Sequence, residues 1–109
     1  RNGDFIFDIN NNPVSLTALI FGRHHKIFNQ ADFIQVYQEC NGRVKLFITI
    51  SESKNYDFRN VQNDFDAKNI NCSFDFIKIN KPIRTAQGKT PLLVNKELLK
   101  INGLLNKFM

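Results

Sequence analysis

The sequence predicts a small α+β domain: a two-layer sandwich in which two helices cover one face of a small mixed sheet, in the order β-α-β-β-α-β. Three observations lead to this fold class. A chain of 109 residues with 42% hydrophobic residues is large enough to bury one core and too short for a second. Apolar and polar residues alternate over Val44–Ile50, as in a strand with one buried face. Segments with apolar residues at helical spacing separate the strand-like runs.

The chain begins with a β-prone run, Asp4–Ile9, which ends in the polar turn Asn10–Pro13. Proline cannot donate a hydrogen bond to a β-ladder, so we expect the strand to stop there. Ser15 is a good N-cap for a following helix over residues 16–27, with histidines in its last turns. The apolar positions of this helix fall at helical spacing and predict one core-facing side: Leu16, Leu19, Ile20 and Ile27.

Two further strands are predicted at Phe33–Glu39 and Val44–Ile50, joined by a tight hairpin turn at Asn41–Gly42. In the second of them, one face carries Val44, Leu46, Ile48 and Ile50, and the other carries Lys45, Phe47 and Thr49. A second amphipathic helix is expected over Phe58–Phe65, followed by a strand at Phe74–Ile79.

The end of the chain divides into two parts. A last short strand is predicted at Leu92–Val94, which closes the domain that we assign to residues 1–94. The tail, residues 95–109, carries apolar residues at near-helical spacing among lysines, interrupted by Gly103. Three interpretations of this tail stay open: a helix that docks on the rest of the protein, a helix at a membrane surface, and a frayed end.

Charge, hydropathy and cysteine content limit the kinds of protein to which the chain can belong. The net charge of +5 favours anionic partners without choosing among them. No run approaches the ~20 apolar residues that a membrane span requires. The chain starts at Arg1 with no signal-like segment, so we expect it to be part of a longer cytoplasmic protein. Cys40 and Cys72 form neither a disulfide framework nor zinc-like spacing, and we expect reduced, mostly buried thiols.

The pair His24–His25 could suggest a metal ligand or a general base. Neighbouring residues of a helix point ~100° apart, so both rings do not readily face one ion, and no Asp, Glu or Cys joins them at ligand spacing. We therefore predict no metal site and a polar helix end favoured by the helix dipole.

The most distinctive candidate site is the run Ile83–Lys89, after the last long strand. Gly88 can adopt backbone angles closed to other residues, the Thr85 hydroxyl can fix the start of a turn, and Lys89 is a compact charge on a long stem. These are the parts of a loop that delivers a cation. The run is not a phosphate-binding P-loop, because the first glycine of that motif would have to stand at Ile83.

This run resembles the closing lysine motif of the adenylate-forming enzymes, the superfamily of acyl-CoA synthetases and aryl-CoA ligases. Arg1-Asn2-Gly3-Asp4 looks like the hinge that opens their C-terminal lid domain, without its leading glycine. The strand Ile34-Gln35-Val36-Tyr37-Gln38 is similar to one in phenylacetate-CoA ligase-like proteins of capsular-polysaccharide gene clusters. The resemblance covers residues 1–94 in a consistent order.

The resemblance implies a mobile domain of an ATP-dependent ligase that activates a carboxylate as an acyl-adenylate and passes it to coenzyme A. Lys89 would be the catalytic lysine of adenylation, supported by Thr85 and Gly88. ATP and Mg²⁺ would be held mostly by a large N-terminal domain of the same protein. This 109-residue chain alone would be inactive.

The resemblance also gives roles to residues away from the loop. Arg1, Gly3 and Asp4 would form the hinge near the nucleotide. Gln35 and Gln38 would serve the domain interface, although a strand directs them to opposite faces, which also allows one exposed glutamine and one with its hydrogen bonds satisfied inside.

Two other functions stay open at this point. A ferredoxin-like nucleic-acid-binding module would suit the predicted topology, the basic charge and the eleven phenylalanines. Its signature strand should carry a glycine and several aromatic residues, whereas Arg43–Ile50 has no glycine and only one aromatic residue, Phe47. The ligase interpretation therefore predicts no nucleic-acid partner. A small-molecule-sensing or purely structural domain of the same architecture is the third possibility.

Overall fold

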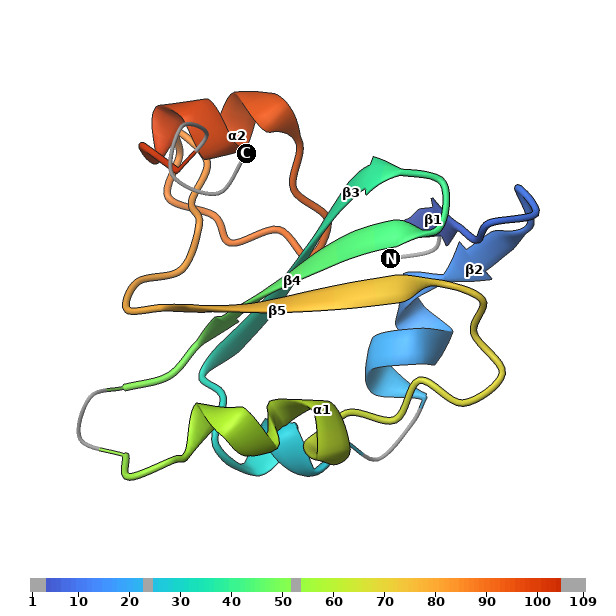
Figure 1. Cartoon of the computed structure of the whole chain (residues 1–109). Helices are drawn as coiled ribbons and strands as arrows, with labels where there is room; N and C mark the ends of the chain where they lie inside the picture. Colours follow the sequence, from blue (N-terminus) through green and yellow to red (C-terminus); the bar gives the residue numbers. More distant parts are fainter. Residues whose placement is uncertain (1–3, 23–24, 52–53, 105–109) are drawn as a thin grey trace.

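The computed structural model describes residues 4–22, 25–51 and 54–104. It contains two sheets and a few short helical segments, which confirms the small α+β fold (Figure 1). A two-stranded sheet pairs β1 with β2, and a three-stranded sheet has the order β3-β4-β5. The strands span Phe5–Phe7 (β1), Pro13–Ser15 (β2), Phe33–Cys40 (β3), Arg43–Thr49 (β4) and Ser73–Ile79 (β5).

The helical segments are short. They span Thr17–Phe21 (η1, a π-helical turn), Lys26–Asn29 (η2, 3-10), Phe58–Asn60 (η3, 3-10), Val61–Asp64 (α1) and Lys96–Ile101 (α2). Figure 1 shows α1 and the segments of η1 and η2 on one side of the three-stranded sheet, as predicted, and α2 on the other side. The C-terminal segment therefore adds a cover to the second face of the sheet.

The N-terminal strand does not end in a break, as the sequence suggested, but turns back into β2. β1 and β2 are antiparallel, with Pro13 opposite Phe7. The Asp8 carboxylate accepts hydrogen bonds from the backbone N–H groups of Asn10 and Asn12, both at 2.9 Å, which closes the polar turn. Proline is tolerated here because it is the first residue of its strand.

The main sheet is mixed. β3 and β4 form the predicted antiparallel hairpin, with Asn41–Gly42 at its turn and Gly42 at φ 80°. β4 and β5 run parallel, so the chain crosses over between them through η3 and α1. The expected last strand at Leu92–Val94 is reduced to one parallel bridge between Val36 and Leu93 on the outer edge of β3.

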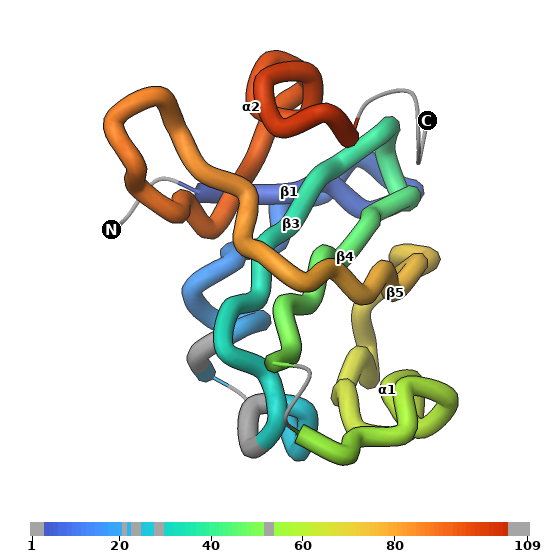
Figure 2. Tube along the Cα trace, turned by 90° about the vertical axis from the view of Figure 1, so that its left-hand side faces the viewer, coloured from blue at the N-terminus to red at the C-terminus, as the bar shows by residue number. Residues whose placement is uncertain are grey.

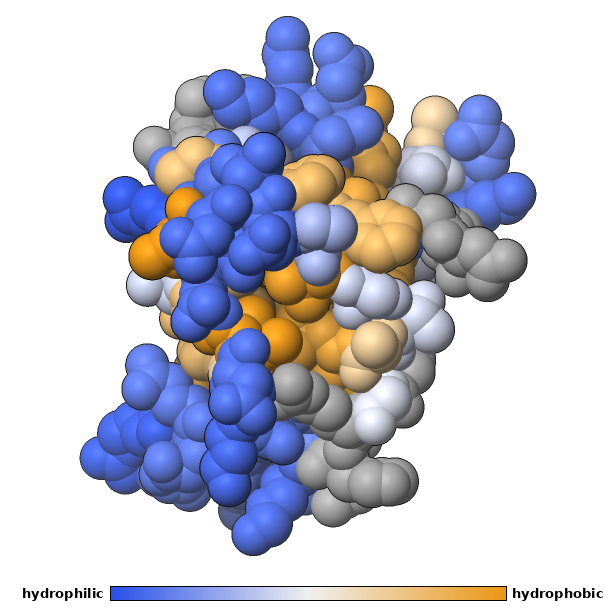
Figure 3. All heavy atoms as spheres, turned by 90° about the vertical axis from the view of Figure 1, so that its right-hand side faces the viewer, coloured by the Kyte–Doolittle hydropathy of each residue, from blue (hydrophilic) through white to orange (hydrophobic). Residues whose placement is uncertain are grey.

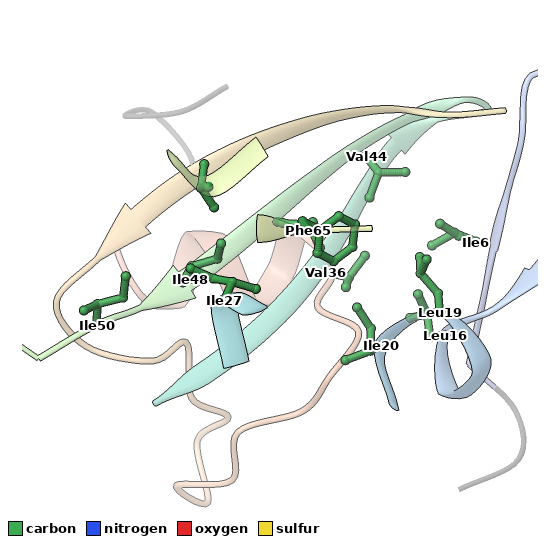
Figure 4. Packing of buried hydrophobic residues seen from close by; sticks show 12 residues of the cluster. Ile6, Leu16, Leu19, Ile20, Ile27, Val36, Val44, Ile48, Ile50 and Phe65 are labelled. Atoms are coloured by element: carbon green, nitrogen blue, oxygen red, sulfur yellow. The ribbon is translucent and has the colours of Figure 1, made fainter. Parts of the chain in front are cut away.

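The larger hydrophobic core lies on the face of the sheet that carries η1, η2 and α1 (Figure 4). The predicted alternation in β4 is confirmed, because Val44, Leu46 and Ile48 belong to this core whereas Phe47 points to the opposite face. The four apolar positions predicted for the first helix, Leu16, Leu19, Ile20 and Ile27, are also buried here.

The first helix is not continuous over residues 16–27, which corrects the prediction. The helical turn of η1 ends at Gly22, whose N–H donates to the carbonyls of Thr17 and Ala18, both at 3.1 Å. A Cβ at Gly22 would lie 2.5 Å from the Ala18 oxygen, so this tight ending requires glycine. Ser15 still acts as a cap, since its Oγ accepts from the Ala18 N–H at 3.3 Å.

The second helix is also shorter than predicted. It ends at Asp64, and Phe65 is already extended, with φ −116° and ψ 123°. Phe65 is buried and stacks face to face on His25, with ring centroids 4.2 Å apart. The packing of this one aromatic ring therefore outweighs the helical spacing that included it.

A partly buried hydrogen bond holds α1 to the segment before it. The Tyr56 hydroxyl donates to Asp64 Oδ2 at 2.6 Å. Burial, followed by this bond to a carboxylate, raises the pKa of Tyr56 far above its ordinary value of 10.0. The folded state therefore stabilises the protonated form of the Tyr56 side chain.

We predict that this bond makes stability fall at alkaline pH. Because the folded-state pKa of Tyr56 lies above the unfolded one, its contribution is complete below pH 10.0 and is lost as the pH rises beyond it. Tyr56→Phe should cost about 1–2 kcal/mol of unfolding free energy at neutral pH and should flatten the alkaline decline. Urea titrations at neutral and alkaline pH measure both effects. Ordinary tyrosinate absorbance at Tyr56 near pH 10.0 in the folded chain would contradict the prediction.

The opposite face of the sheet carries a second, smaller core. It consists of Tyr37, Phe47, Ile79, Ile83, Val94 and Leu99, drawn from β3, β4, β5, the following loop and α2. Across the described ranges, no helix has the length and apolar character needed to cross a membrane. Through Ile83, the second core supports the loop that carries Lys89.

Candidate functional site

The lysine loop, residues 83–91, projects from the body of the domain next to α2 (Figure 2, orange). Thr85 closes it on itself. Its N–H donates to the Lys89 carbonyl at 2.8 Å, its carbonyl accepts from the Gly88 N–H at 2.9 Å, and its Oγ1 accepts from the Lys89 N–H at 3.1 Å. Gly88 has φ 85°, a region where a side chain is strained. Both residues therefore have the local geometry that the sequence predicted.

The base of the lysine loop is held from the sheet by Gln35. This side chain is buried, and its amide reproduces a backbone pairing: Oε1 accepts from the Ile83 N–H at 2.8 Å, and Nε2 donates to the Ile83 carbonyl at 2.7 Å. Nε2 also donates to the Pro91 carbonyl at 2.9 Å. One glutamine of β3 thus fixes both the first and the last residue of the loop.

The next residue of the loop is held from the other side, by α2. Asn102 Oδ1 accepts from the Arg84 N–H at 3.2 Å, and Nδ2 donates to the Arg84 carbonyl at 3.0 Å and to the Leu98 carbonyl at 2.7 Å. Successive residues of an extended chain direct their N–H and C=O groups to opposite sides. Gln35 and Asn102 therefore form hydrogen bonds to neighbouring residues, Ile83 and Arg84, from opposite sides of the chain.

Lys89 itself is exposed at the tip of this fixed frame. Within the described part of the chain its ammonium group forms no ion pair or hydrogen bond, whereas its backbone N–H and carbonyl both bond to Thr85. The nearby Arg84 guanidinium is used differently, because its Nη1 donates to the Gly88 carbonyl at 3.2 Å and braces the loop. The backbone of the loop is thus held by hydrogen bonds, whereas the Lys89 side chain is exposed and can meet an anion.

Gln38 lies on the other side of β3 and holds the N-terminal sheet. Its Oε1 accepts from the Phe7 N–H at 2.9 Å, and its Nε2 donates to the carbonyls of Phe7 at 2.6 Å and Cys40 at 3.0 Å. Gln38 is half-buried, whereas Gln35 is fully buried. Both predicted interface glutamines thus bond to backbone groups within the domain, and the structure does not bring them together into one surface.

The predicted hinge is described only in part. Arg1 and Gly3 lie outside the described residues. The Asp4 carbonyl accepts from the Leu16 N–H at 3.0 Å, and this places Asp4 at the start of the β1–β2 sheet. Of the hinge residues the structure describes Asp4 alone, and the hinge stays a prediction.

His25 does not lie at the polar helix end that the sequence predicts for the histidine pair. His24 lies outside the described residues, and His25 is buried. Its Nε2 donates to the Leu19 carbonyl at 2.7 Å, and its Nδ1 accepts from the Asp66 N–H at 2.8 Å, which places the ring proton on Nε2. His25 joins η1 to the segment after α1, because both ring nitrogens are used within the fold.

The described residues contain no group of three or more His, Cys, Asp or Glu side chains that could hold a metal ion. Cys40 and Cys72 are free thiols, as predicted, but Cys40 is exposed rather than buried. Burial, together with the charge of Asp8, raises the pKa of the Cys72 thiol, so this thiol is a weak nucleophile.

Sequence reasoning missed Asn102 and the bracing role of Arg84. Asn102 lies 18 residues after its partner, at the end of α2, and an isolated asparagine there reads equally well as a helix end. No short-range pattern signals this contact.

Comparisons of the chain with protein-family models, with curated proteins and with solved structures found no match.

Proposed function

We propose that this chain is the C-terminal mobile domain of an ATP-dependent, adenylate-forming ligase and that it delivers Lys89 to the adenylation step. The carboxylate substrate attacks the α-phosphate of ATP, which forms an acyl-adenylate and releases pyrophosphate. The large N-terminal domain holds ATP and Mg²⁺, and coenzyme A accepts the acyl group. The lysine supplies positive charge where negative charge builds up on the phosphoryl oxygens.

One observation carries this proposal: an exposed lysine stands on a loop whose backbone is fixed by Gln35, Asn102 and Thr85. A cation that must reach a site on another domain has to be free of internal ion pairs. It must also be placed reproducibly, because a misplaced charge loses most of its effect on a transition state. An ordinary surface lysine in a loop would not require a buried glutamine beneath it.

A second feature supports docking on a larger domain. Phe5, Phe7 and Ile9 alternate along and just after β1, and they are 42%, 39% and 66% exposed. Figure 3, which views the molecule from the side of β1 and β2, shows hydrophobic side chains gathered in a central area with hydrophilic ones around it. An exposed apolar row of this kind is suited to contact with another protein surface.

The nucleic-acid-binding alternative depends on an open sheet face, and the structure offers it little support. Phe47, the one aromatic residue of the strand that would stack bases, has no exposed surface and lies in the second core with Leu99 of α2. A base cannot stack on a ring that is covered by a helix.

The proposal is tested by exchange of radiolabelled pyrophosphate into ATP. We expect a protein that combines this chain with the proposed N-terminal domain to catalyse exchange that depends on an added carboxylate. The 109-residue chain alone should be folded and inactive, because it lacks the nucleotide site. Exchange by the isolated chain would contradict the proposal. So would an intact protein that shows no exchange with any of a panel of aliphatic and aromatic carboxylates.

A further inference from the structure

A basic cleft lies on the α2 side of the domain, at the start of the lysine loop. Its volume is about 530 Å³, within the range of small-molecule sites. One wall is the chain from the end of β5 to Arg84, and the other is the end of α2 with Asn102 and Leu104. We refer to it as the basic cleft.

The charged groups at the cleft all have one sign. Lys78, Lys81 and Arg84 line it, and no acidic residue is among its described lining residues. In the described part of the chain none of these three cations forms an ion pair, whereas Lys45 on the neighbouring strand is paired with Glu39 and Asp75. A concave site lined by charges of one sign concentrates the potential and attracts the opposite charge.

Apolar residues also line the cleft, and its walls are already in place. Pro82 and Leu104 line it with half-buried side chains, whereas Ile79 and Ile83, which also line it, lie almost wholly within the second core. The two walls are joined by the paired hydrogen bonds between Asn102 and the backbone of Arg84. Because the walls are fixed before a ligand binds, little binding free energy is lost in ordering them.

We propose that the basic cleft binds a small organic anion, with its apolar part against Pro82 and Leu104 and its anionic oxygens toward Lys78 and Lys81. Phosphate and carboxylate groups share this chemistry. The site is separate from Lys89, which does not line the cleft, so the inference does not rest on the function proposed above.

The test uses the isotope-labelled 109-residue chain, NMR titration and four probes: hexyl phosphate, hexanoate, hexanol and inorganic phosphate. We expect hexyl phosphate or hexanoate to shift the amide signals of Ile79, Ile83, Arg84 and Asn102. The tighter of the two identifies the anionic group. Hexanol and inorganic phosphate should each bind at least tenfold more weakly, because each offers only half of the recognised chemistry.

Two charge-matched double variants locate the site. Lys78→Gln with Lys81→Gln should weaken the better probe at least tenfold, while Lys26→Gln with Lys68→Gln, at exposed positions outside the cleft, should change it less than twofold. Lys89→Met should leave it unchanged. Equal losses in the two double variants, shifts confined to other residues, or hexanol binding as well as the anions would overturn the inference. The amide spectra report whether each variant is folded.

Discussion

Replacing Lys89 by methionine in the intact protein is expected to lower carboxylate-dependent pyrophosphate exchange by about 10²–10³-fold, or about 2.7–4 kcal/mol, the usual cost of removing one oriented charge-stabilising group. The side chain is exposed, and its backbone bonds to Thr85 do not depend on the ammonium group. Stability should therefore stay near that of the unchanged protein. Exchange kinetics and urea unfolding of the same preparation separate these two effects.

A matched control is Lys68→Met, which removes one charge at another exposed position and should change exchange less than twofold. The transfer of a chemically prepared acyl-adenylate to coenzyme A should be largely kept in Lys89→Met, since the charge is proposed to act in the first half-reaction. Exchange by Lys89→Met at the unchanged rate would remove the catalytic role, and an equal loss in Lys68→Met would show only that net charge matters.

The second large effect is expected from Gln35→Met, which keeps the length of the side chain and removes its amide. Three hydrogen bonds are lost, and the N–H and carbonyl of Ile83 are left buried without these partners. At about 1 kcal/mol for each bond, we expect a loss of about 3 kcal/mol in the free energy of unfolding. Hydrogen exchange at the amides of Gly88 and Lys89 should also become faster, because the lysine loop loses its attachment to β3.

Gln38→Met is the matched control for this prediction. Gln38 also makes three hydrogen bonds to backbone groups, but it is half-buried, and water can replace its amide. We expect a loss of about 1 kcal/mol and no change in exchange at the lysine loop. If Gln35→Met costs no more than Gln38→Met, or leaves exchange at Gly88 and Lys89 unchanged, then Gln35 does not hold the loop as the structure indicates.

The two predictions together separate chemistry from placement. Lys89→Met removes the charge and leaves the frame, whereas Gln35→Met leaves the charge and loosens the frame. If the lysine must be placed reproducibly, Gln35→Met should also slow pyrophosphate exchange at temperatures where the variant is fully folded. A normal rate in the folded variant would show that the loop needs no support from β3.

The lysine loop was predictable from sequence only in its local part. Thr85, Gly88 and Lys89 are neighbours, so their turn geometry follows from short-range sterics and hydrogen bonding. The sequence singles out Gln35 as an interface residue, but its partner Ile83 lies 48 residues away. The Gln35 side-chain amide could serve either a domain interface or an internal contact. Only the fold shows which groups this amide contacts.

The sequence by itself determined the features that depend on neighbours: the fold class, the Asn41–Gly42 hairpin, the two faces of β4 and the open turn around Gly88. Tertiary structure decided the early ends of the first two helices, the pairing of β2 with β1 and the placing of α2 on the second face of the sheet. The physical reason is the distance along the chain over which each kind of interaction acts. Steric and hydrogen-bond preferences act over a few residues, whereas the stacking of Phe65 on His25 and the grip of Asn102 on Arg84 exist only once distant segments have packed together.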